Sequence, residues 1–331
     1  MSMLYIESPS IDPAFNLALE QYIFDSLDKS NIYFMLWQND NAIIVGKNQN
    51  TIEGINSDYI KEHHIKVIRR LSGGGTVYHD LGNLNYTFVV DAEQPSVMDL
   101  KKFGHIVAQA LNQIGILAVV SGRNDILING RKFSGNAQYV KDGRIMHHGT
   151  LMFDSNLSVL SNALKVSQSK IVSKGVKSIK SSVTNIYKHL PIPMTLAEFK
   201  GHLLSCLFTD AGISSYSLTP EDIRAVTELK QKVYDTWEWN YGYSTQYEIR
   251  KKRRFEGCGE LQLSMNVSEG IIRDLIVYGD YFGLQDSSDL SSLLTGIKVC
   301  EEDLRFALNN TDVGQYFSGM NTTEFINFLI S

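Results

Sequence analysis

Two tight-turn dipeptides constrain the fold of this chain more than any other feature of its sequence. Asn129-Gly130 separates the strand-like runs "DILI" and "RKFS", and Asp142-Gly143 follows one strand length later. Both dipeptides favour the left-handed backbone conformation that a two-residue hairpin turn requires. The sequence therefore predicts three antiparallel strands between residues 125 and 153.

The expected strand pairing gives this sheet two different faces. It places Asp125 opposite Ser134 and Asn136 opposite His148, unless a bulge at Gly135 breaks the register. One face would then carry Asp125, Lys132, Ser134, Asn136, Gln138 and His148. The other would carry Ile126, Phe133, Ala137, Tyr139, Ile145 and His147. The polar face is either a solvated surface or the floor of a binding site.

Helices and strands are mixed along the rest of the chain. Apolar residues at helical spacing predict helices over 13–27 and 101–115. Short apolar runs predict strands in 42–50, 64–70 and 84–90. This order, together with the hairpins, predicts an α+β fold with mixed and antiparallel sheets rather than a strictly parallel sheet.

Composition limits the classes of protein to consider. The 331 residues suffice for one large domain and a smaller one. No apolar run is long enough to cross a membrane, and the first residues lack the layout of a signal peptide. Three scattered cysteines argue against a disulfide framework, which favours a cytoplasmic location. The formal net charge of −5 gives no support to a nucleic-acid partner.

The segment "RRLSGGGTVYHD" (69–80) joins two arginines to three glycines. Glycines let a ligand approach the backbone closely, and guanidinium groups suit phosphate or carboxylate oxygens. The segment matches neither the Walker loop nor the Rossmann fingerprint. A plain turn, with His79 and Asp80 as loop-capping residues, is the alternative interpretation.

Four segments, in order along the chain, carry a resemblance to a known family. "RRLSGGGTVYHDLGNLNYTF" closely resembles the lipoate-binding loop of the lipoate–protein ligases. "SGRNDILINGRKFSGNAQYVKDGRIMHHGTLMF" resembles the signature that contains the essential lysine of that family. "KGVKSIKSSVTN" (174–185) resembles its adenylate-binding segment, and "WEWNYG" (237–242) resembles the end of its large domain.

The resemblance implies both a fold and an activity. It implies a biotin-ligase-like catalytic domain over 1–242, a linker over 243–252 and a small α+β domain over 253–331. The implied reaction uses ATP and Mg²⁺ to convert lipoate to lipoyl-adenylate. The lipoyl group then passes to a lysine of a carrier, either a lipoyl domain of a 2-oxoacid dehydrogenase complex or the glycine-cleavage carrier protein. Lipoate and octanoate are both possible substrates.

Residue roles follow from the matching positions. Lys132 is the implied catalytic residue, a cation between the lipoate carboxyl and the α-phosphate. Asp125 would orient Lys132, hold Mg²⁺ or only cap a strand. His148 is a weaker candidate, which could satisfy a local hydrogen bond instead. The full set implied to bind lipoate or ATP is Arg70, Ser72, Gly73, Gly74, Gly75, Thr76, Val77, Tyr78, His79, Asp125, Lys132, Ser134, His148, Lys174 and Gly175.

Three alternatives to a ligase stay open at this point. An octanoyl or lipoyl transferase of the same fold would need a reactive cysteine, but all three cysteines lie beyond residue 200. A biotin ligase is disfavoured by the glycine pattern. A protein that binds lipoate without ligating it is disfavoured by Lys132 and Arg70. The segment 166–185 is expected either to close over the adenylate or to be a plain connector.

Overall fold

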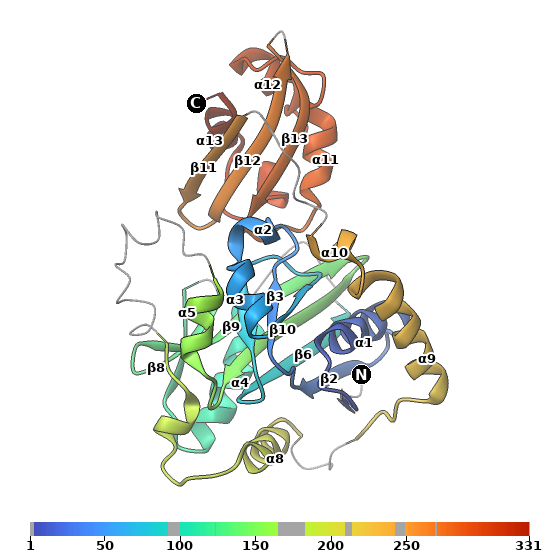
Figure 1. Ribbon diagram of the computed structural model, residues 1–331, viewed down its shortest axis with the longest axis vertical. Coiled ribbons are helices and arrows are strands. Elements are labelled where there is room, and N and C mark those ends of the chain that lie inside the picture. Colours follow the sequence, from blue (N-terminus) through green and yellow to red (C-terminus); the bar gives the residue numbers. More distant parts are fainter. Residues whose placement is uncertain are drawn as a thin grey trace.

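The computed structural model describes residues 3–91, 100–122, 124–164, 183–208, 214–241, 249–268 and 270–330. Figure 1 shows a large lower body and a smaller upper one, which contains β11, β12 and β13. Three sheets organise the described residues, two in the large body and one in the small body. The α+β fold class that the sequence predicts is confirmed.

The largest sheet has the strand order β1-β2-β6-β10-β9-β8-β7. Only β1 and β2 are parallel in it, and the other neighbouring strands are antiparallel. One face packs on α4 and α8, and the other packs on α1 and α9. The strands are β1 (Met3–Glu7), β2 (Ile32–Trp37), β6 (Asn83–Asp91), β7 (Ala118–Ser121), β8 (Asp125–Ile128), β9 (Arg131–Lys141) and β10 (Arg144–Met152).

A small sheet of order β4-β3-β5 lies over the large one and carries the glycine-rich segment. Its strands are β3 (Ala42–Val45), β4 (Lys66–Arg69) and β5 (Val77–His79). Side chains alternate between its faces, so that Ile44 and Ile68 join the core around α1. Ile43 and Val67 point the other way, into a separate core beneath α3 and α5.

The helices of the large body fill the space around these sheets. Pro13 begins the first helix, where its fixed φ angle is favourable, and Gly115 follows the α4 helix with a φ of 83°. The helices are α1 (Pro13–Ser26), α2 (Thr51–Gly54), α3 (Ser57–Glu62), α4 (Leu100–Gln113), α5 (Leu157–Ala163), η1 (Ile186–His189), α8 (Leu196–Leu207), α9 (Pro220–Leu229), η2 (Lys230–Tyr234) and α10 (Trp237–Tyr241).

The C-terminal body has its own hydrophobic core between one sheet and its helices. Its strands β11 (Ile249–Phe255), β12 (Gly259–Ser268) and β13 (Ile271–Gly279) are antiparallel neighbours. Its helices are α11 (Ser287–Leu294), α12 (Glu301–Ala307), η3 (Val313–Gln315) and α13 (Thr322–Ile330). Because β11 begins at Ile249, the last four residues of the stretch 243–252, which we assigned to a linker, belong to a strand.

Both predicted hairpin turns are present. Asn129 and Gly130 have φ angles of 50° and 74°, and Asp142 and Gly143 have 49° and 75°. Positive values at both central residues are the signature of the hairpin turn that these dipeptides favour. The three strands β8, β9 and β10 therefore lie where the sequence predicts them.

The predicted register of these strands is wrong at two places. His148 pairs with Ala137 rather than with Asn136, because pairing continues without a shift from Lys141 and Arg144. An irregularity between Ile126 and Leu127 places Asp125 opposite Gly135 rather than Ser134. A one-residue shift turns a side chain to the opposite face of a sheet, so the expected polar face does not exist as one surface.

Candidate active site

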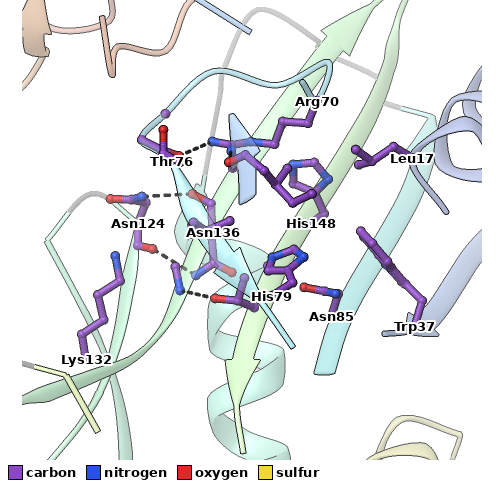
Figure 2. Close-up of a pocket in the computed structure, with 18 residues that line it drawn as sticks. Leu17, Trp37, Arg70, Thr76, His79, Asn85, Asn124, Lys132, Asn136 and His148 are labelled. Carbon is purple, nitrogen blue, oxygen red and sulfur yellow. Dashed lines mark hydrogen bonds between the residues drawn. The ribbon is translucent and has the colours of Figure 1, made fainter. Parts of the chain in front are cut away.

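A cavity of about 120 Å³ lies between the small sheet and the large one (Figure 2). The small sheet and the glycine-rich segment form one wall, and β2, β6, β9 and β10 form the other, with Leu17 of α1 at one side. The lining residues are Leu17, Trp37, Ile44, Arg70, Gly74, Gly75, Thr76, Val77, His79, Asn85, Asn124, Lys132, Gly135, Asn136, Ala137, His148, Gly149 and Thr150.

The structure brings together about half of the residues that the sequence assigns to the site. Those that line the cavity are Arg70, Gly74, Gly75, Thr76, Val77, His79, Lys132 and His148. Five others do not line it: Ser72, Gly73, Tyr78, Asp125 and Ser134. Lys174 and Gly175 lie outside the described residues.

Strand geometry explains why two of these residues, Tyr78 and Ser134, do not line the cavity. Tyr78 alternates with Val77 and His79 on β5, and its hydroxyl donates to Asn41 at 3.1 Å on the opposite face of the small sheet. Ser134 pairs with Ile126 and is fully buried on the side away from the cavity. The irregularity in β8 and β9 sets Lys132 on the cavity face, where a Cβ atom at Gly135 would stand 3.0 Å from its Nζ.

Lys132 lies at the solvent-exposed end of the cavity. Its Nζ is 2.7 Å from Oδ1 of Asp125, and the two side chains are 35% and 38% exposed. Both residues therefore keep access to solvent, and Lys132 can exchange the carboxylate of Asp125 for an anionic ligand. Val183 is the first described residue after the stretch 165–182, and it forms a parallel β-bridge with Lys132.

The two neighbouring arginines are buried and bind the backbone. Arg69 donates to the carbonyl oxygens of Gly46, Lys47 and Gln49 and to those of Trp239 and Asn240. These bonds tie the segment after β3 to the motif that begins at Trp237.

Arg70 organises the glycine-rich loop itself. Its guanidinium donates to the carbonyl oxygens of Gly73 at 2.6 Å and Gly75 at 2.9 Å. Burial lowers the pKa of Arg70 to about 10, so the group is still a cation at neutral pH. Arg70 therefore supplies positive charge to the cavity wall while holding the loop in shape.

The glycine-rich loop also receives the C-terminal body. The backbone N–H of Gly74 donates to the carbonyl oxygen of Tyr281 at 3.2 Å. A Cβ atom at Gly73 would overlap that same carbonyl, and one at Gly74 would lie 2.9 Å from Cζ of Phe282. The absent side chains at these two positions thus allow the two bodies to meet. At Gly75 nothing lies within 4 Å of an added Cβ atom.

A buried hydrogen-bonded chain runs from the loop to α1. Arg70 Nε donates to Ser72 Oγ at 3.0 Å, and Ser72 Oγ lies 2.6 Å from His148 Nε2. His148 Nδ1 donates to the Glu20 carboxylate at 2.9 Å. Ser72 and Glu20 thus hold the ring of His148, which lines the cavity, in its orientation. Sequence reasoning missed Glu20, because a charged residue in a helix is usually exposed and its burial here depends on tertiary contacts.

His79 is neutral in this environment. Burial, together with the positive charge of the nearby Arg70, lowers the pKa of His79 to about 3. The side-chain amide nitrogen of Asn39 lies 3.1 Å from His79 Nδ1 and can only donate to it. The ring hydrogen therefore resides on Nε2, and the structure fixes the tautomer.

The cavity wall contains residues that the sequence analysis missed. Trp37 ends β2 and Ile44 lies inside β3, at positions that resemble ordinary core residues, and Asn85 interrupts the apolar run of β6. Because burial is common for such residues, only the approach of the two sheets distinguishes them from the core.

Three further observations concern cysteines, metal ligands and membrane-spanning helices among the described residues. Cys206 is half-buried, Cys258 is buried and Cys300 is exposed, and none of the three lines the cavity. Among the residues that the structure describes, no group of three or more histidine, cysteine, aspartate or glutamate side chains is placed to hold a metal ion. No helix in those described ranges is both long and apolar enough to span a membrane.

Comparison with known proteins identifies the family. Residues 12–208 match the lipoyl protein ligase A/B catalytic domain, and residues 244–329 match the bacterial lipoate protein ligase C-terminus. The chain is 43% identical to the lipoate-protein ligase LplJ of Bacillus subtilis over 99% of this chain and 100% of that protein. It is 40% identical to lipoate–protein ligase 1 of Staphylococcus aureus over 99% and 100%. The chain belongs to the lipoate–protein ligase family and is a ligase enzyme, which confirms the resemblance.

Solved structures agree with this assignment. LipL1 of P. falciparum, in complex with lipoate, superposes with a TM-score of 0.79 at 24% identity, over 99% of this chain and 98% of that one. A lipoate-protein ligase A bound with ATP superposes with a TM-score of 0.63 at 25% identity, over 73% of this chain and 99% of that one. A bi-partite ligase of Thermoplasma acidophilum, analysed with its E2 lipoyl domain, gives 0.64 at 27% identity, over 75% and 98%.

Proposed function

We propose that this ligase activates lipoate with ATP to lipoyl-adenylate and transfers the lipoyl group to a lysine of an acyl-carrier domain. The observation that carries the proposal is Lys132, a half-exposed cation at the mouth of a mostly apolar cavity. An apolar cavity suits the acyl chain, and a cation at its mouth suits the carboxylate that must react.

Two displacements make up the proposed reaction. In the first, a carboxylate oxygen of lipoate attacks the α-phosphorus of ATP, and pyrophosphate leaves as the bond between the α- and β-phosphates breaks. In the second, the neutral amine of the carrier lysine attacks the acyl carbon. AMP then leaves and the nitrogen loses a proton, which completes the amide bond.

Lys132 is the residue that we assign to catalysis in both steps. The first step brings a carboxylate towards a polyanion, and positive charge at the meeting point offsets their repulsion. Arg70 adds a second charge from the cavity wall, and the backbone of Gly75 to Tyr78 is proposed to bind the ligand. His79 is proposed to contact the ligand as a neutral N–H donor.

Mg²⁺ is expected to accompany ATP rather than to occupy a protein cage. Mg²⁺ often binds one or two carboxylates together with substrate phosphates and water. Asp125 is the carboxylate beside Lys132, so it fits that arrangement and would hold the ion at the phosphates. When bound, Mg²⁺ would supply charge neutralisation to the leaving pyrophosphate.

The segment that includes Lys174 and Gly175 is proposed to bind the adenylate. Support comes from its C-terminal end, where the Thr184 N–H donates to the Lys132 carbonyl oxygen at 2.8 Å. Arg131 also donates to the carbonyl oxygen of Val183 at 2.6 Å. These two hydrogen bonds hold Val183 and Thr184, at the end of the segment, beside Lys132. We further propose residues 1–242 as the catalytic domain and 253–331 as an accessory domain.

Lipoyl domains of 2-oxoacid dehydrogenase complexes and the glycine-cleavage carrier protein are the proposed acceptors, and the cytoplasm is the proposed location. The test is to incubate the enzyme with ATP, Mg²⁺, lipoate and each carrier separately. Mass spectrometry should find one added lipoyl group on a single carrier lysine, with pyrophosphate released in equal amount. Lipoate binding without pyrophosphate release would instead identify a binding protein.

A further inference from the structure

The edge of the large sheet nearest to Lys132 carries an exposed apolar face. Leu117 and Val119 are 71% and 56% exposed, whereas Ala118 between them is 4% exposed. This alternation is that of an extended strand, so Leu117 and Val119 point to one face while Ala118 joins the core around α4. Large apolar side chains scattered singly on a surface are ordinary, but two neighbours on one strand face form a patch.

The strand pairing places this patch in line with Lys132. Val119 pairs with Leu127, and Leu127 pairs with Lys132. Paired residues of an antiparallel ladder point to the same face of a sheet, so these three side chains form one row across β7, β8 and β9. Two strand spacings separate Val119 from Lys132 by about 10 Å. The row ends at Val119, because β7 is the last strand of the sheet.

The glycine-rich wall of the cavity is already covered by the protein itself. Gly74 donates to the carbonyl oxygen of Tyr281, and Phe282 packs against Ala137 of β9. The strand β8, which joins β7 to β9, lies instead on the flank of the large body away from α1 and α9 (Figure 1). A large partner that approaches Lys132 from this flank therefore meets the exposed face of β7.

The backbone edge of β7 is occupied at Ala118. The side-chain oxygen of Asn112 accepts from the Ala118 N–H at 2.7 Å, and its amide nitrogen donates to the Ala118 carbonyl oxygen at 3.4 Å. A side chain that occupies these edge groups hinders strand-to-strand pairing, a common route by which identical chains associate. The exposed side chains of β7, rather than its backbone, are therefore the groups that a partner would contact.

We propose that Leu117, Val119 and the half-buried Leu127 form a docking surface for the acyl-carrier domain that receives the lipoyl group. The proposal rests on the function proposed above and names the surface that its second step uses. In that step a carrier lysine brings its amine to the acyl carbon beside Lys132. A lysine amine stands on a four-carbon stem, so the domain that carries it must contact the enzyme close to Lys132. The patch is continuous with that point of contact, and it fits a carrier with an exposed apolar side chain near its acceptor lysine.

The size of the patch suits a transient complex. A few residues near the centre of an interface supply most of its binding energy, and the surrounding contacts exclude water. Two or three apolar side chains can form such a centre. Turnover requires that the lipoylated carrier leave, so the reaction needs a complex that dissociates readily rather than a permanent one.

The test separates adenylation from transfer in the double variant Leu117→Ser, Val119→Ser. A single burst of pyrophosphate, with lipoate and ATP but no carrier, measures adenylation. Its rate should stay within about twofold of the parent, because neither residue lines the cavity. Transfer is then measured to an unmodified lipoyl domain of a 2-oxoacid dehydrogenase and, separately, to the unmodified glycine-cleavage carrier protein.

For the carrier that is lipoylated, KM should rise by about tenfold in the double variant. Transfer from the enzyme-bound adenylate to hydroxylamine, which has no surface to dock, should not change. Phe306→Ser is the matched control, because Phe306 is an apolar side chain of α12 that is 78% exposed. This control should leave the carrier KM unchanged.

The possible results separate the two proposals. An unchanged carrier KM in the folded double variant, or an equal rise in Phe306→Ser, would overturn the docking surface alone. An equal loss of transfer to hydroxylamine would also overturn it, since the substitutions would then act on the adenylate site. Absence of the pyrophosphate burst, or of lipoylation of both carriers, in the unmodified enzyme would overturn the proposed function.

Two further measurements use the unmodified enzyme. If the double variant fails to fold, amide hydrogen exchange decides the matter. Exchange over 117–121 should slow when the carrier binds, whereas exchange over 301–307 should not, and unchanged exchange over 117–121 would overturn the docking surface. Sedimentation should find no dimer that depends on this face. An enzyme that is dimeric, and that becomes monomeric in the folded double variant, would show that a second copy occupies the patch instead.

Discussion

The charged side chains on the two walls of the cavity are held in contrasting ways. On the glycine-rich side, the buried Arg69 and Arg70 donate mainly to backbone carbonyls, and Gly74 donates to Tyr281 of the C-terminal body. On the opposite wall, Lys132 is held by one carboxylate and is 35% exposed. The difference teaches that charge in this site has two uses. Buried charge shapes the loop, and exposed charge is available to the substrate.

Loss of Lys132 should produce the largest effect on activity. Lys132→Ala removes the cation that faces the reacting carboxylate and phosphate, so adenylation should fall by about a hundred- to a thousandfold, or about 3–4 kcal/mol of barrier. The measurement is pyrophosphate release with saturating ATP. Lys141→Ala, at the exposed end of the same strand, is the matched control. Near-normal release by Lys132→Ala would contradict the catalytic assignment.

Loss of Arg69 should act on stability instead. Arg69→Met leaves several buried carbonyl oxygens without a donor, so the free energy of unfolding should fall by at least about 2 kcal/mol. Denaturant unfolding measures this change. Arg224→Met serves as the control, because the Arg224 side chain is 70% exposed and its ion pair with Glu221 lies at the surface. If the folded Arg69→Met protein kept its stability but lost lipoate binding, Arg69 would serve the substrate, as Lys132 is proposed to do, rather than the fold.

Substitution of Gly73 and of Gly75 should change the free energy of unfolding by different amounts. Gly73→Ala places a methyl group against the Tyr281 carbonyl, so the two bodies must shift, at a cost of about 1–3 kcal/mol. Gly75→Ala meets no atom within 4 Å and should leave the free energy of unfolding within about 0.5 kcal/mol of the parent. Thermal unfolding of the two variants compares them directly. Equal losses would mean that the loop, and not the contact with Tyr281, sets the requirement for glycine.

The cysteines should have the smallest effect. Changing Cys206 and Cys300 to Ser and Cys258 to Ala should keep kcat/KM for carrier lipoylation within about twofold, because none of them lines the cavity. Cys258 takes Ala because it is buried in the core of the C-terminal body, where Ala introduces no polar group. Complete loss of acyl transfer in the folded triple variant would favour a thioester-forming transferase over a ligase.

Local signals in the sequence sufficed for much of the fold. Asn129-Gly130 and Asp142-Gly143 predicted both turns, because few dipeptides tolerate two positive φ angles in succession. The helical spacing of apolar residues predicted α1 and α4. The family motifs, read together, predicted the ligase and pointed to Lys132 as its catalytic residue, an assignment that the variants above test.

Long-range contacts decided what the sequence could not. The irregularity in β8 and β9 turned Ser134 away from the cavity and Lys132 towards it. Gly135 indicates that a bulge can form in this stretch, but it does not place the shift between Lys132 and Ser134. The approach of Tyr281 to Gly74, and the hydrogen bonds of Arg69 to Trp239 and Asn240, join chain segments that are distant in sequence. Residue identity sets what a side chain can donate or accept. Only the packing of the two sheets determines which side chains, such as those of Arg70, His79 and Lys132, face the cavity.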